Sequence, residues 1–144
     1  MHEKEMQKLA KTAGNAIEEI VAIMKYMSKV FSELNSNVIL DMQKYHRNAW
    51  RAYMNFKGKC VATSISTNIN RGIKEGLYRT DMNMEILSQL RLSEMDFAFN
   101  PDVFPPGKFS MVEVQIELVK HFIYGIATLK GHQLMNKLLQ SKIK

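Results

Sequence analysis

Hydrophobic residues recur every three or four positions along most of the chain, which is the spacing of one face of an α-helix. The first run consists of Met6, Leu9, Ala13, Ile17, Ile20, Met24, Met27, Phe31 and Leu34. Charged residues such as Lys8, Glu18 and Lys25 fall on the opposite face. This pattern predicts one long amphipathic helix over residues 6–34, followed by a short helix over residues 38–45.

Two more helices are predicted in the middle of the chain, each with a clear boundary. Helical spacing of apolar residues continues from residue 48 to residue 75, and Gly76 stands where a left-handed cap is needed to end that helix. The next helix is expected over residues 83–99, because Pro101 lacks the N–H group that would extend it.

The last predicted helix has more apolar surface than one core requires. It begins at Ser110, which forms a capping box with Glu113, and is expected to run to residue 139. One apolar stripe consists of Val112, Ile116, Val119, Ile123 and Ile126, and a second lies beside it at Leu118, Phe122, Gly125 and Leu129. A helix that is apolar over more than half its girth faces two partners, its own core and a second chain.

We therefore expect self-association through the last two predicted helices, in a two-fold contact of four helices. The small residues Gly125, Ala127 and Gly131 leave room for a close helix crossing. The predicted dimer interface contains Ile86, Leu90, Leu118, Phe122, Gly125 and Leu129. The alternative is a monomer in which the last helix is the central helix of the core.

Composition agrees with a single folded domain that spans residues 1–144. Hydrophobic residues make up 46% of the 144 and charged residues 24%, which is the balance of a globular protein rather than of a disordered tail. No alternating pattern of apolar and polar residues predicts paired strands. The expected fold is therefore an all-α bundle of about five helices.

Charge and cysteine content indicate which binding partners and which cellular compartment to expect. The net charge is +6, but the lysines and arginines are scattered and form no basic stripe of the kind that binds nucleic acid. The single cysteine, Cys60, cannot form an internal disulfide, and no apolar run is long enough to cross a membrane. We expect a cytoplasmic protein that has no contact with a membrane.

The sequence lacks the patterns that catalysis or metal binding requires. The four histidines, His2, His46, His121 and His132, do not have the spacing of metal ligands. Cys60 has no neighbouring base in the sequence, and no glycine-rich loop follows a strand to hold a phosphate. We therefore expect no enzyme activity, no metal and no cofactor.

Three segments resemble one protein family. RGIKEGLYR at residues 71–79 is similar to the signature with which a long helix ends in TetR-like transcription regulators. Residues 122–128 resemble the middle of the final dimerisation helix of that family. The whole span of residues 15–139, including NPDVFPPGKF at residues 100–109, is similar to TetR-like regulators of the Bacteroides type.

The resemblance implies an effector-binding and dimerisation domain whose helix-turn-helix domain is absent from this chain, so that DNA would be contacted only through that missing domain. In the family, a ligand cavity lies among the first, the long central and the penultimate helices. The candidate lining here is Met24, Met27, Met42, Trp50, Tyr53, Met54, Met95 and Phe97. The alternative for each of these side chains is an ordinary place in the core.

Three functions remain to be distinguished. The first is a homodimeric regulatory domain that binds an unknown small, largely apolar effector. The second is a helical homodimeric scaffold with a fully packed interior, and the third is a small basic bundle that binds nucleic acid. Stabilisation by apolar small molecules would favour the first function, and salt-sensitive binding to duplex DNA would favour the third.

Overall fold

Every regular element in residues 2–33 and 36–142, which the computed structural model describes, is a helix. In chain order the elements are α1 (His2–Thr12), α2 (Ala16–Ser32), α3 (Ser36–Tyr45), α4 (Arg47–Phe56), the π-helical turn η1 (Lys57–Val61), α5 (Ala62–Lys74), α6 (Met84–Ala98), α7 (Met111–Ile126) and α8 (Leu129–Lys142). The prediction of an all-α bundle is confirmed. The described helices exceed the expected five, mainly because the first and the last predicted helices are each divided in two.

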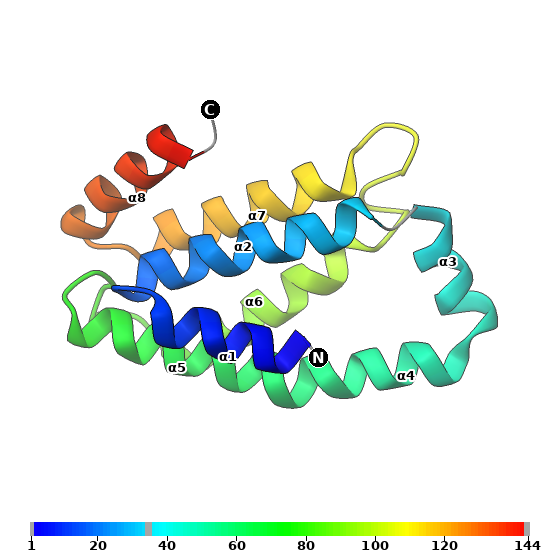
Figure 1. Ribbon diagram of the computed structural model, residues 1–144, viewed down its shortest axis with the longest axis horizontal. Helices are drawn as coiled ribbons and strands as arrows, with labels where there is room; N and C mark the ends of the chain where they lie inside the picture. The colour runs from blue at the N-terminus through cyan, green and yellow to red at the C-terminus, as the bar shows by residue number, and fades with distance from the viewer. Residues whose placement is uncertain (1, 34–35, 143–144) are drawn as a thin grey trace.

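Four helices form the centre of the bundle (Figure 1). α2 packs on α5 and α7, and α6 also packs on α5 and α7, so the four helices close into a ring. α1 lies against α2 at one side, and α8 packs on α2 and α7 at the other. The large side chains with the least exposure belong to Ile17, Asn68, Ile69, Tyr78, Ile123, Ile126 and Met135.

The prediction of a single helix over residues 6–34 is wrong, because α1 ends at Thr12 and α2 begins at Ala16. Asn15 caps the start of α2 with its side-chain oxygen. The Arg71 guanidinium, which comes from α5, donates to the carbonyl oxygen of Ala13 at 2.8 Å and so satisfies the backbone at the turn. The predicted end of the helix at Leu34 lies outside the described residues.

The prediction of one helix over residues 110–139 is also wrong, because a distant segment interrupts it between α7 and α8. The Thr128 N–H donates to the Leu77 carbonyl at 2.9 Å, and the Arg79 N–H donates to the Ile126 carbonyl at 2.8 Å. A Cβ atom on Gly131 would overlap the Leu77 carbonyl. This small residue therefore makes room for the subunit's own backbone rather than for a helix of another copy.

The remaining helix boundaries follow their local signals. Gly76 has the left-handed φ of +73° that ends α5 as predicted. The Asn83 side chain accepts from the Ile86 N–H at the start of α6. Ser110 accepts from the Glu113 N–H at the start of α7. Helical backbone extends from α4 through η1 to the end of α5, as the pattern over residues 48–75 predicts, although the π turn within it is not predicted.

The RGIKEGLYR segment ties the end of α5 to α2 through a buried polar network. The ring of Tyr78 occupies the space that a side chain on Gly72 would need. The Tyr78 hydroxyl donates to Asn68 Oδ1 at 2.7 Å, and Asn68 Nδ2 donates to Glu19 Oε2 at 2.9 Å. Glu19 also forms an ion pair of 2.9 Å with Arg71. The segment that resembles the family signature therefore has a structural role in this chain.

Candidate ligand-binding pocket

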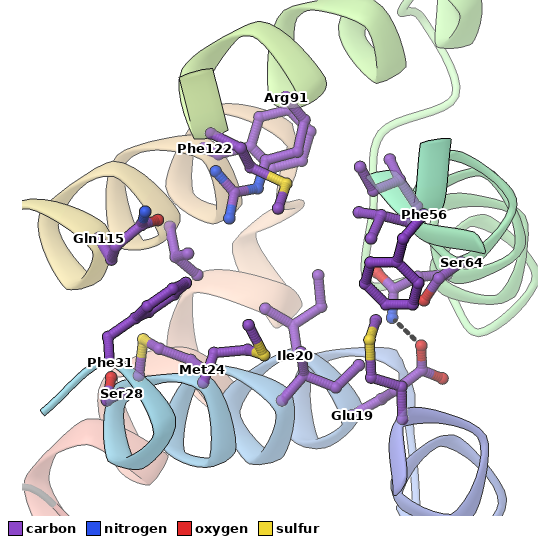
Figure 2. A pocket seen from close by; sticks show the side chains of 18 of the residues that line it. Glu19, Ile20, Met24, Ser28, Phe31, Phe56, Ser64, Arg91, Gln115 and Phe122 are labelled. Atoms are coloured by element: carbon purple, nitrogen blue, oxygen red, sulfur yellow. Dashed lines mark hydrogen bonds between the residues drawn. The ribbon is translucent and has the colours of Figure 1, made fainter. Parts of the chain in front are cut away.

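A pocket of about 100 Å³ lies inside the ring of α2, α5, α6 and α7 (Figure 2). Along one side, α2 contributes residues from Glu19 to Phe31. Arg91 from α6, with Gln115 and Phe122 from α7, faces them from the opposite side. Most of the wall is apolar, and it includes Met6, Met24, Met27 and Met95. Flexible thioethers of this kind can repack around ligands of different shape.

Four of the eight predicted pocket residues line this space, and four do not. Those that line it are Met24, Met27, Tyr53 and Met95. Met42 and Trp50 are half-buried outside the lining, while Met54 and Phe97 are exposed. Trp50 contributes indirectly, because its ring packs on that of Tyr53 with centroids 5.2 Å apart.

The π turn η1 explains why Trp50 and Met54 miss the pocket. A π turn contains about one residue more than an α turn. Counting across it at regular α-helical spacing therefore misplaces the face of the preceding helix by one residue, or ~100°. In an uninterrupted α-helix, Trp50 and Met54 would lie on the same face as Val61, which lines the pocket. With the extra residue in η1, the pocket side of α4 presents Tyr53 and Phe56 instead.

Two phenylalanines each lie where the other was predicted, Phe122 in the pocket and Phe97 on the surface. Phe122, predicted at the dimer interface, is only 4% exposed and lines the pocket. Phe97, predicted in the pocket, is 45% exposed on α6. It shares a helix face with Ile86 and Leu90, since positions separated by four and seven residues point in similar directions.

Polar side chains interrupt the apolar wall of the pocket. The Tyr53 hydroxyl and Gln115 Nε2 are buried and have no hydrogen-bond partner within the described residues. Arg91 lies in the same wall and pairs with Glu94 through a single contact of 3.3 Å. Burial lowers the pKa of Arg91 and raises the pKa of both Glu94 and Tyr53. The charge of Arg91 acts on Tyr53 in the opposite direction, so the two groups lie within electrostatic reach of each other.

Arg91 and Gln115 were not predicted as pocket residues, although the sequence contains a signal for both. Gln115 occupies the same helix face as Val119 and Phe122, which are apolar and buried. Arg91 follows Leu87 by four positions along the inward face of α6. A polar side chain within an apolar stripe is the pattern that would have identified them, because burying such a group is costly unless it has a partner.

Two other polar groups in the wall already have partners within the protein. Glu19 and Asn68 belong to the network with Arg71 and Tyr78, and the hydrogen bond that Glu19 accepts from Asn68 is the dashed line in Figure 2. These groups stabilise the bundle. The Tyr53 hydroxyl and Gln115 Nε2, by contrast, retain hydrogen-bonding capacity that the protein does not use.

The predicted interface residues are distributed unevenly over the surface. Leu129, Ile86 and Leu90 are exposed by 77%, 64% and 43%. Gly125 is exposed with open space around it, and Leu118 is half-buried. With the exception of Phe122, these positions on α6, α7 and the start of α8 can be reached from outside the subunit.

Other kinds of site find less support in the described part of the chain. A second hollow of about 390 Å³ lies between the end of α2 and the loop that leads into α7, where Ser110 is already used as the helix cap. No group of three acidic, histidine or cysteine residues among the described positions could hold a metal ion. None of the described helices has the length and hydropathy needed to cross a membrane.

Comparison with known proteins does not assign a family to the chain. No family model matches it, and neither a curated protein nor a solved structure shows significant similarity to it. The resemblance to TetR-like regulators therefore rests on the sequence alone, mainly on residues 71–79, 100–109 and 122–128.

Proposed function

We propose that the chain is the effector-binding and dimerisation domain of a TetR-like transcription regulator and that its pocket holds a small, largely apolar effector. The observation that carries this proposal is the methionine-rich pocket enclosed by α2, α5, α6 and α7. A scaffold has no use for such a space, because each unfilled volume in a core reduces stability. Ligand sites are typically concave and apolar, with a few polar groups that orient the ligand.

The same two helices line the pocket and carry the proposed dimer surface. Arg91 and Met95 of α6 and Phe122 of α7 face the pocket, whereas Ile86 and Leu90 lie on the exposed face of α6. A ligand that changes the spacing of α6 and α7 would therefore also change how two subunits meet. Such coupling requires that the ligand bind one arrangement of the dimer more tightly than the other.

Thermal denaturation with 1-hexanol tests the pocket. At tenfold excess over its dissociation constant, this apolar probe should raise Tm by about 3–6 °C, because it binds only the folded state. Val119→Phe, which fills the pocket, should abolish the increase. The matched variant Val103→Phe changes an exposed loop residue and should retain it. An equal increase in both variants would show that the alcohol binds elsewhere.

A homodimeric scaffold is the second candidate function, and the exposed apolar residues favour it. Ile86, Leu90 and Phe97 form an apolar stripe on α6 that is interrupted at Ser93, and a partner helix can cover it whether or not a ligand is bound. If 1-hexanol and other small apolar molecules leave Tm unchanged while the protein is a dimer, the scaffold is the better account.

A further inference from the structure

Two hydrogen-bond donors in the pocket wall lack the partners that buried polar groups normally have. The Tyr53 hydroxyl and Gln115 Nε2 have none within the described structure. A third donor, Arg91, lies in the same wall and donates through Nη1 to Glu94 at 3.3 Å. Tyr53 comes from α4, Arg91 from α6 and Gln115 from α7, so three separate elements direct donors to one pocket.

Leaving such groups unpartnered reduces the stability of a folded protein, so a cluster of them in a cavity points to a ligand. Methionine or leucine at position 115 and phenylalanine at position 53 would fill the same volume without that cost. All three groups can donate hydrogen bonds, so a ligand with an acceptor group can partner each of them. An alcohol or an amine provides a poorer match than a group with several acceptor lone pairs.

The guanidinium of Arg91 favours a negatively charged acceptor, whereas the charge of Asp96 acts on Tyr53 in the opposite sense. Burial lowers the pKa of Arg91, which means that the surroundings do not fully compensate the guanidinium charge. Its partner Glu94 reaches only one of its nitrogens, at 3.3 Å. A guanidinium can bind a carboxylate through two parallel hydrogen bonds, and such pairs are among the strongest in proteins.

We propose that the effector is an amphipathic monocarboxylate, whose carboxylate accepts hydrogen bonds from Arg91, Tyr53 and Gln115 while its hydrocarbon part lies among the methionines of α2. This inference rests on the proposed function of the pocket as an effector site. It adds the chemical class of the ligand and the orientation of its charged end, toward α6 and α7. The carboxylate of Glu19, which also lines the pocket, opposes a second negative charge and so disfavours dicarboxylates.

The size of the pocket limits the hydrocarbon part. A cavity of about 100 Å³ is of the same order as the engineered apolar cavities that hold benzene, so a short chain fits before the side chains move. Repacking of Met24 and Met27 extends the space, since thioether side chains adopt several rotamers. The best straight-chain ligands should therefore have about six to eight carbons.

Isothermal titration of the full chain with matched six-carbon probes tests the proposal. Hexanoate should bind at least about tenfold more tightly than 1-hexanol, and hexylamine should bind more weakly than both. The three probes share one tail, so the comparison isolates the charged end. Equal binding of hexanoate and 1-hexanol would overturn the carboxylate proposal and leave the apolar pocket standing. Failure of all three probes to bind would contradict the proposed function itself.

Two conservative variants test the donors without endangering the fold. Tyr53→Phe and Gln115→Met remove groups that have no described partner, so the free protein should melt at the same temperature or higher. Each should weaken hexanoate binding by about threefold to tenfold and change 1-hexanol binding by less than about twofold. Equal weakening of both probes would show a general effect on the pocket and would contradict the assigned contacts.

Removal of the guanidinium is the strongest test. Arg91→Met combined with Glu94→Gln removes both members of the ion pair, so that no buried charge is left alone. Hexanoate should lose at least about tenfold in affinity and its advantage over 1-hexanol should disappear. Lys120→Met removes a cation of α7 that pairs with the exposed Glu117, and it should leave both affinities unchanged. A similar loss in Lys120→Met would attribute the effect to net charge and overturn the proposal.

Discussion

Gly72 and Tyr78 contact each other so closely that neither residue can change without disturbing the end of α5. The Tyr78 ring packs directly on the Gly72 backbone, and its hydroxyl reaches Asn68 inside the core. Burial raises the pKa of Tyr78, so the hydroxyl keeps its proton and remains a donor. At this position, backbone shape and hydrogen bonding depend on the same pair of residues.

Gly72→Ala should destabilise the protein by about 2–4 kcal/mol, because the added Cβ overlaps a ring that has no space to move into. Gly58→Ala is the matched control, since nothing lies near its added methyl group. That change should be neutral or stabilising by up to about 1 kcal/mol, as expected for an exposed helical glycine. Urea denaturation followed by circular dichroism measures both, and equal effects would contradict the packing described here.

Tyr78→Phe should lower the free energy of unfolding by about 1–3 kcal/mol, because Asn68 Oδ1 loses its donor inside the core. Tyr45→Phe removes a hydroxyl from a side chain that is 75% exposed and should change stability by less than about 0.5 kcal/mol. Chemical denaturation of the two variants side by side gives the comparison. A neutral Tyr78→Phe would mean that the hydroxyl adds nothing to the core.

Among the helices, the starts and ends that depend on neighbouring residues could be predicted from the sequence. Gly76 and Ser110 each act within one helical turn, so their caps were visible in the pattern. The breaks after α1 and α7 depend on contacts from Arg71 and Leu77, which are more than 45 residues away along the chain. No local pattern contains that information.

The pocket was predicted in part for a related reason. Met24, Met27 and Met95 follow regular α-helical spacing and were identified, whereas Trp50 and Met54 were misplaced by the π turn. Apolar periodicity reports which face is buried. It does not indicate which buried face surrounds a cavity. The unpartnered donors of Tyr53 and Gln115 could therefore be found only from the structure.

The Thr128 hydroxyl links the start of α8 to Gly76, just after α5, and its loss should affect both. Its hydroxyl accepts from the Gly131 N–H at 3.1 Å at the start of α8 and donates to the Gly76 carbonyl at 2.7 Å. Thr128→Val should therefore cost about 1–2 kcal/mol, whereas Thr128→Ser keeps the hydroxyl and most of the stability. Thermal unfolding and amide exchange in α8 measure the effect. Equal stability of the valine and serine variants would contradict a capping role.

For the whole molecule, the central prediction is the association of two subunits through α6 and α7. Sedimentation velocity at about 10–50 μM should show a dimer. Leu90→Glu should convert it to a folded monomer, because a charge on the exposed stripe of α6 opposes apolar contact. Val103→Glu places the same charge on an exposed loop and should leave the dimer intact. A wild-type monomer at these concentrations would disprove the proposed interface.

The extra residue in η1 also has a consequence for how such a domain can diverge. Because a π turn contains one residue more than the surrounding helix needs, a single-codon deletion between positions 57 and 61 can be absorbed without unfolding α4 or α5. That deletion would leave Tyr53 and Phe56 at the pocket, because regular α-helical spacing back from Val61 would then lead to these two residues. Descendants of the domain could thus lose the π turn in one mutational event and keep the same hydroxyl donor facing the ligand.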